Sequence, residues 1–396
     1  MRILRVHNAY QHRGGEDVVV AAETKLLRSH GKSVETLIIS NDTITTQRSI
    51  LATLELGLST VWSHSGREAV AQAARDYQPD IVHFDNTFPL ISPGAYSSAR
   101  ASGPAVVQTL HNYRTLCPNA LFYRDGHVCE DCLGKTIPYP GVIHSCYRGS
   151  PAQTGVVAAM LTYHRLRRTW IQDVDRYIAL TEFARQKFIE GGLPKDRIAV
   201  KPNFVDAASP SLGTRGDHFL FVGRLSPEKG VTTLLQAQDR HGQEVRIAGD
   251  GLLSESLHTA ARAQPSFKVL GHLSVDQVRA EMLQARALLF PSKWYEGFPI
   301  TITEAFANSL PVIASRFGAM AEVIEDNVTG LLFAPGDADD LAAKVRWAAA
   351  HPDEMRRMGE SARREYETKY TPERNYEMLI EIYERAIAHR RNRRTR

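Results

Sequence analysis

The fold of this chain is indicated first by residues 287–307, ALLFPSKWYEGFPITITEAFA, which predict a buried strand, a tight turn and a helix. Four apolar residues at 287–290 predict the strand. Gly297 and Pro299 shape the turn, and the helix is expected to begin near Ile300. Ligands of open parallel sheets bind outside the carboxyl ends of the strands. The segment that follows residue 290 is therefore expected to line a binding site.

Two acids bracket this turn, Glu296 in the loop and Glu304 in the early helix. The backbone amides between them are expected to bind an anion at the helix N-terminus, namely those of Gly297, Phe298, Ile300 and Thr301. Carboxylates accept hydrogen bonds from hydroxyls and amides bind phosphate, which suits a sugar nucleotide. An ordinary helix-start acid beside a surface acid would give the same pattern.

Two cations follow another predicted strand in residues 221–230, FVGRLSPEKG. Arg224 leaves the carboxyl end of the strand, and Lys229 lies at the opening of the next helix. Together they would neutralise a diphosphate without a metal, arginine as a bidentate fork and lysine as a point charge. Taken singly, each cation also fits a solvated strand exit.

Short apolar runs alternate with amphipathic stretches along the chain, which predicts parallel sheets with crossover helices. Strands are expected at residues 3–8, 34–39, 81–84, 105–110, 177–180 and 198–201, and then at 219–222, 245–248, 267–270, 287–290 and 311–314. Residues 206–216 between the two series lack apolar periodicity and predict a linker. The prediction is an α/β protein with two doubly wound, Rossmann-like domains facing each other across a cleft, at residues 1–205 and 217–370.

A last helix is predicted over residues 371–396, with Thr371 as its cap and Pro372 at its first position. Its apolar stripe has helical spacing, so we expect it to pack back on the first domain. The stripe consists of Tyr376, Leu379, Ile382, Tyr383 and Ala386. Five arginines among the last seven residues form a basic tail, which we interpret as a frayed, solvated end.

The second half resembles the retaining family 4 glycosyltransferases of GT-B fold. The resemblance rests on VGRL at 222–225 with Lys229, on Glu296 and Glu304 in an E-x7-E pair, and on PVIA at 311–314. It extends through GAMAEVI at 318–324 and GLLF at 330–333, and so covers about residues 219–341 in order and spacing. Ser309 departs from the family pattern, which usually has glycine there.

This resemblance implies roles for individual residues. Arg224 and Lys229 would hold the donor diphosphate, Glu296 would meet the transferred sugar, and Glu304 would meet the ribose. The first half matches more loosely. Gly14 and Gly15 are similar to the glycine loop of the family, near the donor phosphate or the acceptor. His111, after the strand at 105–110, stands where the family has a histidine facing the sugar.

The family often has aspartate after that histidine, whereas this chain has Asn112. The implied catalytic residues are His111, Arg224, Lys229 and Glu296. Retention in this family is usually explained without a protein nucleophile, because the leaving phosphate takes the acceptor proton, and the reaction needs no cofactor. The implied function is transfer of a sugar from a nucleotide-diphosphate sugar to a glycan or lipid-linked acceptor, in polysaccharide or surface-glycan biosynthesis.

Three alternatives remain at this stage. An epimerase of the same fold would convert its sugar nucleotide without an acceptor. A phosphorylase would need a pyridoxal-bearing lysine, which no motif indicates. A zinc-stapled module that binds nucleic acid or protein would use the cysteine loop and the arginine tail. The near-neutral body of the chain argues against a nucleic-acid groove, which needs a broad basic face.

All four cysteines lie in one long loop, expected as an insert at residues 112–150. Their spacing, C-x11-C-x2-C-x13-C, favours a structural zinc site over free thiols, disulfides or an iron–sulfur cluster. The proposed ligands are Cys117, Cys129, Cys132 and Cys146.

A second metal motif, Asp173-Val174-Asp175, has the D-x-D form of GT-A enzymes but precedes a strand, so we interpret it as solvated turn acids.

Composition places the chain among ordinary globular proteins, with 43% hydrophobic and 23% charged residues. The longest apolar run has six residues, at 156–161, so no membrane span is expected. Charges interrupt the N-terminus too early for a signal peptide, which predicts a cytoplasmic protein.

Residues 163–170, YHRLRRTW, fit either a packed helix with one basic face or a helix that rests on the inner face of an anionic membrane.

Overall fold

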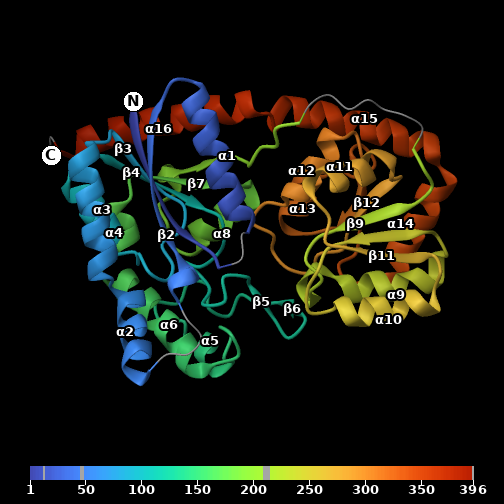
Figure 1. The fold of residues 1–396 in the computed structure, drawn as a ribbon, viewed down its shortest axis with the longest axis horizontal. Coiled ribbons are helices and arrows are strands. Elements are labelled where there is room, and N and C mark those ends of the chain that lie inside the picture. The colour runs from blue at the N-terminus through green and yellow to red at the C-terminus, as the bar shows by residue number, and fades with distance from the viewer. Residues whose placement is uncertain (12–13, 45–48, 208–214, 395–396) are drawn as a thin grey trace. The chain divides into compact units, whose positions relative to one another are not determined.

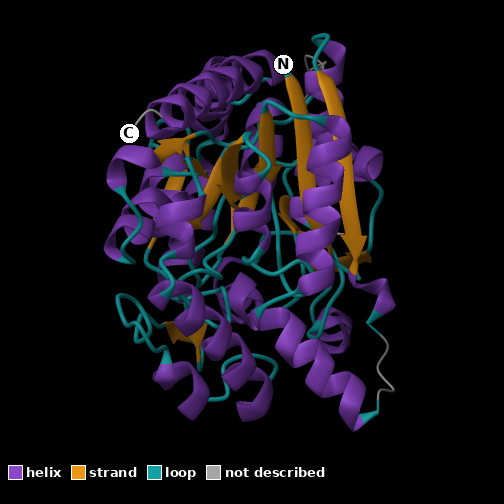
Figure 2. Cartoon of the chain, turned by 90° about the vertical axis from the view of Figure 1, so that its left-hand side faces the viewer, coloured by secondary structure: helices purple, strands orange, loops and turns teal. Residues whose placement is uncertain are grey.

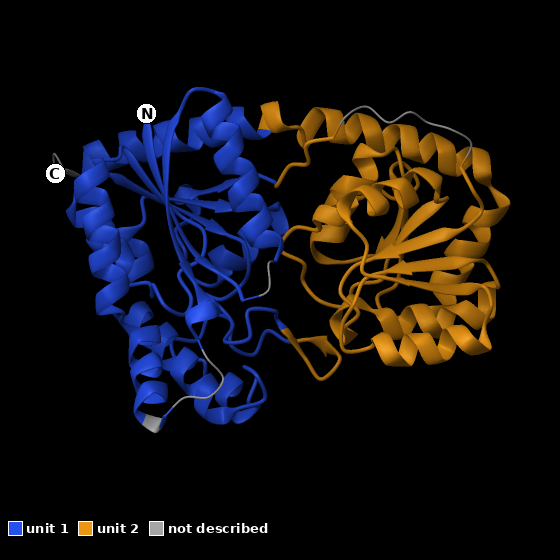
Figure 3. Cartoon of the chain, in the orientation of Figure 1, with its two compact units in different colours: residues 1–122, 129–202, 375–396 blue, residues 123–128, 203–374 orange. Residues whose placement is uncertain are grey.

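The computed structural model describes residues 1–11, 14–44, 49–207 and 215–394. The chain divides into two compact units, coloured separately in Figure 3. Unit 1 comprises Met1–Phe122, Cys129–Pro202 and Asn375–Arg396, and unit 2 comprises Tyr123–Val128 and Asn203–Arg374. Most of the predicted linker, residues 208–214, and the last tail arginine, Arg396, lie outside the described residues.

Unit 1 is built on a parallel sheet with the strand order β2–β1–β3–β4–β7–β8. Helices lie in front of and behind its strands (Figure 2). The sheet consists of β1 (Arg2–Ala9), β2 (Ser33–Ser40), β3 (Ile81–Phe84), β4 (Ala105–Leu110), β7 (Arg176–Ala179) and β8 (Ile198–Val200). The helices are α1 (Gly15–Ser29), α2 (Ile50–Val61), α3 (His64–Tyr77), α4 (Ala95–Ala101), α5 (Tyr139–Ile143), α6 (Pro151–Leu166), α7 (Thr169–Asp173), α8 (Glu182–Glu190) and α16 (Pro372–Arg394).

Unit 2 contains a second parallel sheet with the order β11–β10–β9–β12–β13–β14 (Figure 1). Its strands are β9 (Phe219–Val222), β10 (Val245–Ala248), β11 (Phe267–Gly271), β12 (Ala287–Phe290), β13 (Val312–Ser315) and β14 (Gly330–Phe333). Its helices are α9 (Val231–His241), α10 (Ser254–Ala263), α11 (Val275–Gln284), α12 (Ile300–Ala307), α13 (Gly318–Val323), α14 (Ala338–Ala350) and α15 (Pro352–Lys369). A short antiparallel pair, β5 (Tyr123–Arg124) and β6 (His127–Val128), groups with this unit.

The α/β prediction is confirmed, since both sheets are parallel and each predicted strand coincides with an observed one within two residues at either end. Two features are missing from the sequence prediction, namely the β5–β6 pair and strand β14. Strand β14 begins at Gly330, where a Cβ would lie 2.1 Å from the Val312 carbonyl oxygen. Only a glycine lets the edge strand approach β13 this closely, and a glycine at the start of a short apolar run weakens the sequence signal for a strand.

Helix α16 packs its apolar stripe into the core of unit 1. Leu379, Ile382, Tyr383 and Ala386 form one cluster with residues of β1, β3 and β4. The hydroxyl of Tyr383 also lies 2.7 Å from Nδ1 of His83 on β3, where both groups are buried. The last helix is therefore a structural part of the first unit.

The expectation of a frayed tail is wrong for the described residues. Helix α16 continues to Arg394, and Arg390 donates to the carbonyl of Arg100 at 2.6 Å. Arg393 donates to the carbonyl of Gln172 at 3.1 Å. Carbonyl groups at the ends of neighbouring helices thus hold the arginines against the unit.

The interpretation of Asp175 as a solvated acid is also wrong. Its side chain is buried, and Oδ2 accepts a hydrogen bond from the Val106 amide at 2.9 Å. Nδ1 of His389 lies 3.3 Å from Oδ1. Asp175 therefore links α16 to strand β4.

No described helix is long and apolar enough to cross a bilayer. The segment at residues 163–170 is a packed helix end and turn. Trp170 is only 5% exposed, His164 is buried, and Arg165 donates to the backbone carbonyls of Thr115 and Leu116. These contacts favour the packed interpretation of that segment.

We expect Leu379→Ala to destabilise unit 1 by about 2–5 kcal/mol, because it removes a fully buried side chain and leaves a cavity. The measurement is chemical denaturation followed by circular dichroism. The matched control is Glu384→Ala on the exposed face of the same helix, which should change the free energy of unfolding by less than about 0.5 kcal/mol. Equal effects of the two variants would contradict the packing of α16.

Candidate functional site

The order of strands in unit 2 reverses between β9 and β12, which are neighbours although β10 and β11 separate them in sequence. Such a reversal leaves a crevice at the carboxyl ends of the two strands, where doubly wound proteins bind ligands. Arg224 and Lys229 follow β9, and Glu296 follows β12. Both predicted groups of charged residues therefore meet at the switch point of this sheet.

Gly230 brings the two loops together. Its φ is +74°, and a Cβ at this position would lie 1.8 Å from the carbonyl oxygen of Pro291. Any larger residue would force the loop after β9 away from the loop after β12. The amide of Lys293 also donates to the carbonyl of Glu228 at 2.8 Å, which joins the loops a second time.

Lys229 and Glu296 form an ion pair across these loops, with Nζ 2.8 Å from Oε1. The same oxygen accepts hydrogen bonds from Ser292 Oγ at 2.6 Å and Trp294 Nε1 at 2.9 Å. Oε2 of Glu296 has no hydrogen-bond partner among the described residues. The carboxylate is therefore held on one oxygen and open on the other.

Arg224 does not share this contact. Its side chain is 61% exposed and pairs with Glu228, at 3.2 Å between Nη2 and Oε1. An exposed pair of this kind contributes little free energy, so the guanidinium remains available to a ligand.

Glu304 lies in the second turn of α12, and its side-chain carboxyl forms no hydrogen bond or ion pair in the described part of the chain. Burial raises the pKa of its carboxyl group.

The prediction of free amides at the start of this helix is wrong for Ile300, whose amide donates to the Phe298 carbonyl at 3.0 Å. The amides of Gly297 and Phe298 make no backbone hydrogen bond within the described residues.

Unit 1 has its own switch point, between β1 and β3. Gly14 and Gly15 lie at the start of α1, after β1, but the Gly14 amide is already used. It donates to Oδ2 of Asp17 at 2.7 Å and so caps the helix. The predicted role of this amide at a phosphate would require that bond to break.

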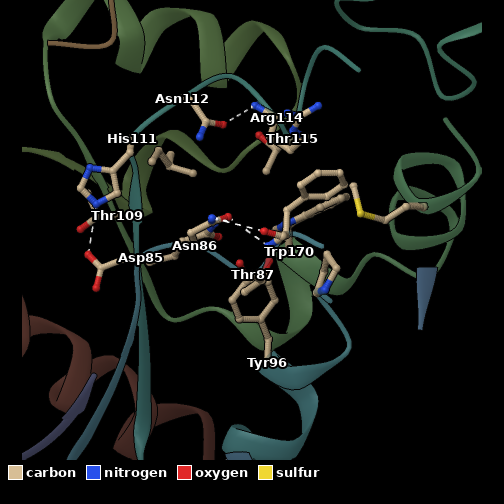
Figure 4. A pocket seen from close by; sticks show the side chains of 15 residues that line it. Asp85, Asn86, Thr87, Tyr96, Thr109, His111, Asn112, Arg114, Thr115 and Trp170 are labelled. Carbon is tan, nitrogen blue, oxygen red and sulfur yellow. Dashed lines mark hydrogen bonds and ion pairs between the residues drawn. The ribbon is translucent and has the colours of Figure 1, made fainter. Parts of the chain in front are cut away.

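His111, at the end of β4, points toward Asp85, at the end of β3 (Figure 4). Its Nε2 lies 3.1 Å from Oδ1 of Asp85. Burial alone would lower the pKa of His111, but the hydrogen bond to Asp85 and the charges of Glu16 and Asp85 raise it overall. Burial likewise opposes ionisation of Asp85, but Arg5 and the two histidines, His83 and His111, hold its pKa well below the usual range.

A buried ion network fixes Asp85. Arg5 donates to it twice, from Nε at 3.1 Å and from Nη2 at 2.6 Å. Arg5 also donates to Glu23 at 2.9 Å, and Glu23 in turn pairs with Lys201. The four side chains are almost completely buried and carry two charges of each sign, so the net charge of the network is zero.

Asn112 is likewise paired with an acid. Its Nδ2 donates to Oε1 of Glu16 at 2.6 Å, and Tyr10 donates to the other oxygen at 2.9 Å. Glu16 comes from the first turn of α1. Asn112 stands where the family often has aspartate, and the carboxylate beside it belongs to Glu16, at the start of α1.

A small cavity of about 40 Å³ lies beside His111 in unit 1. Arg114 lines it and is covered by aromatic rings, with its guanidinium 4.5 Å from the Phe88 ring centre and 5.0 Å from that of Tyr147. Tyr96 and Trp170 line the inner side (Figure 4). The cavity is large enough for a water or a hydroxyl group, and smaller than a sugar ring.

The cysteine site is not present as a preformed centre. No group of three or more His, Cys, Asp or Glu side chains is arranged to hold a metal ion in the described part of the chain. Burial raises the pKa of Cys132 to about 11, and the thiols of Cys117, Cys146 and Cys129 act in the same direction. The structure therefore does not show the four-cysteine metal site, which stays a prediction.

Two family descriptions match the chain. "Glycosyltransferase Family 4" matches residues 3–209, and "Glycosyl transferases group 1" matches residues 207–365. The chain belongs to Glycosyltransferase Family 4. The resemblance drawn from the motifs is thereby confirmed at the level of these two domains.

Curated relatives of this family 4 chain include glycogen synthase of Mycobacterium tuberculosis, at 29% identity over 57% of this chain and 58% of that protein. The amylovoran biosynthesis glycosyltransferase of Erwinia amylovora is 28% identical over 52% and 56% of the two chains. The chain spans about half to three-fifths of the length of such relatives.

Solved structures show the same GT-B fold. The Anabaena protein HepE in complex with UDP has a TM-score of 0.66, with 17% identity over 96% of this chain and 99% of that one. Sucrose-phosphate synthase from Thermosynechococcus elongatus has a TM-score of 0.71, with 15% identity over 98% and 100%.

The sequence analysis did not identify Asp85 as the partner of His111, or Glu16 as the partner of Asn112. A signal was present for Asp85, because it follows the strand predicted at residues 81–84, next in the chain to the strand that ends at His111. Carboxyl ends of parallel strands share one edge of a sheet. No comparable signal marked Glu16, whose contact depends on the angle of α1.

We expect Asp85→Asn to lower the pKa of His111, because it removes the negative charge that stabilises the imidazolium. Asparagine has nearly the same size, but it removes one charge partner of Arg5, so circular dichroism checks that the variant folds. The measurement is an NMR pH titration of the His111 ring. Asp76→Asn, an exposed carboxylate on α3, is the control and should leave the His111 titration unchanged. An unchanged His111 pKa in Asp85→Asn would show that the pair has no electrostatic effect.

Proposed function

We propose that this protein is a retaining glycosyltransferase that moves a hexosyl group from a nucleotide-diphosphate sugar to a glycan or lipid-linked acceptor in the cytoplasm. The observation that carries the proposal is the Lys229–Glu296 pair at the switch point of unit 2, with one carboxylate oxygen open. Relatives named for glycogen and amylovoran synthesis support a role in polysaccharide or surface-glycan assembly.

The donor would bind in unit 2. Lys229 can turn toward a diphosphate without releasing Glu296, because Ser292 and Trp294 still hold Oε1. Oε2 of Glu296 is then free to accept hydrogen bonds from sugar hydroxyls. The half-buried, unpaired carboxyl of Glu304 fits a ribose hydroxyl, which would supply the missing partner.

The chemistry would rest on charge stabilisation. As the glycosidic bond to the diphosphate breaks, negative charge grows on the leaving oxygen, and Arg224 and Lys229 are placed to neutralise it. The leaving phosphate takes the proton of the acceptor hydroxyl on the same face, so the anomeric configuration is retained. Solved neighbours of the same fold with UDP and with UDP-glucose support this class of donor.

The direct test is a thermal-shift screen of nucleoside diphosphates and nucleotide sugars. A cognate donor should raise the melting temperature, because it binds the native state alone. The release of the nucleoside diphosphate is then measured to detect hydrolysis or transfer of the donor that stabilises the protein. If no nucleotide shifts the transition, the proposed donor class is wrong.

Lys229→Ala and Glu304→Ala should each reduce transfer by about 100-fold or more, as expected when one preorganised charge or hydrogen-bonding group is removed. Lys25→Ala, an exposed lysine on α1, is the matched control and should keep full activity. Circular dichroism of all three variants checks their folding. Full turnover in Lys229→Ala and Glu304→Ala would remove both residues from the site.

We also propose that the four cysteines hold a structural zinc ion once the metal is supplied. The support is their spacing in sequence and the mutual influence of the four thiols on the pKa of Cys132. Metal analysis of protein purified without chelator should give about one zinc per chain, and a Cys129→Ser, Cys132→Ser variant should contain none. A native protein free of zinc and iron would refute the site.

A further inference from the structure

Helix α2 exposes a row of leucines that no other part of the described chain covers. Leu51, Leu54 and Leu58 are 78%, 60% and 74% exposed. Their spacing places them on one face of the helix, while Gly57 on another face approaches Val156 of α6. Monomeric soluble proteins rarely leave a continuous aliphatic row in water, so this face is expected to meet an apolar partner.

The row belongs to a larger apolar surface. Helices α2 and α5 both pack against α6, and the three helices gather at one end of unit 1 (Figures 1 and 2). Each of the other two helices also exposes large apolar side chains there, namely Tyr139 and Ile143 of α5 and Leu166 of α6. We name these three residues, together with Leu51, Leu54 and Leu58, the apolar end of unit 1.

Cations outnumber acids in the segments that form this surface. Residues 49–62, 134–148 and 151–168, which form the three helices and their flanks, contain five Lys or Arg residues against one acid, Glu55. Several cations lie on aromatic rings, as Lys135 does on Tyr139 and Arg167 does on Trp62. Exposed aliphatic side chains on helices that also carry cations and amphipathic aromatic rings are typical of helices that lie in the interface of an anionic bilayer.

We propose that the apolar end of unit 1 docks on the surface of a membrane that contains anionic phospholipid. The leucines of α2 enter the acyl boundary, and the surrounding Lys and Arg residues pair with lipid phosphates. A second copy of the chain is a poor occupant, because a two-fold contact through this face would bring two sets of positive charge together. The docking element is α2, and the basic segment 163–170 contributes only its exposed cations and Leu166.

This inference is independent of the proposed sugar transfer, because binding to vesicles requires no donor or acceptor. The experiment is co-sedimentation of the full chain with phosphatidylglycerol-containing vesicles and with pure phosphatidylcholine vesicles. We expect binding to the anionic vesicles, weaker binding to the neutral ones, and a decrease as salt rises from about 0.1 M to about 1 M.

Leu54→Glu with Leu58→Glu should weaken binding to the anionic vesicles at least about 10-fold, since two apolar side chains no longer enter the lipid. The control is Leu252→Glu with Val275→Glu, at two even more exposed apolar residues of unit 2, and this variant should bind as the native protein does. All four positions are exposed, so folding should be unaffected, and circular dichroism verifies this.

Three outcomes would overturn the proposal. The native protein could fail to bind anionic vesicles, or the α2 variant could bind them as well as the native protein does. Alternatively, analytical ultracentrifugation could show that the native chain is a dimer which the α2 variant converts to a monomer. That last result would assign the surface to a second copy of the chain.

Discussion

The ion network around Arg5 is the constraint on which the arrangement of unit 1 depends. Arg5 lies on β1 and joins Asp85 after β3 to Glu23 on α1, and Glu23 joins Lys201 after β8. Four buried charges are costly unless each is paired, and removal of any one would leave another uncompensated. The network therefore links β1, α1 and the segments after β3 and β8, and it holds Asp85 beside His111.

Unit 2 reaches a comparable result with fewer charges. Gly230 lets two loops come into contact where larger residues would clash, and the contact brings Lys229 within hydrogen-bond distance of Glu296. Ser292 and Trp294 then fix the carboxylate from its own loop. A backbone approach, and not a buried ion network, positions the charged pair here. One lysine can consequently change partners while the acid stays in place.

The sequence predicted the parallel sheets and most strand positions, because the spacing of apolar residues and the length of apolar runs can be determined from residues that are close together in the chain. Family motifs also marked Lys229 and Glu296, which the structure brings together, while the roles given to Arg224 and Glu304 stay predictions. The sequence did not predict which groups would be satisfied internally. The Ile300 amide, the Gly14 amide and the Asp175 carboxylate all find partners that depend on loop geometry or on residues far away in the chain. Local pattern carries no information on such long-range pairing.

The His111–Asn112 pair shows how a departure from a motif is best interpreted. Asparagine in place of aspartate suggests a lost carboxylate when only the motif is considered. The structure instead supplies two carboxylates to the same strand end, Asp85 to the histidine and Glu16 to the asparagine. Asn112 donates a hydrogen bond that an ionised aspartate could not donate, so Glu16 would be repelled if the family residue were present. Asn112 and the acid at the start of α1 are therefore parts of one arrangement, in which helix α1 supplies the negative charge beside the residue that follows His111.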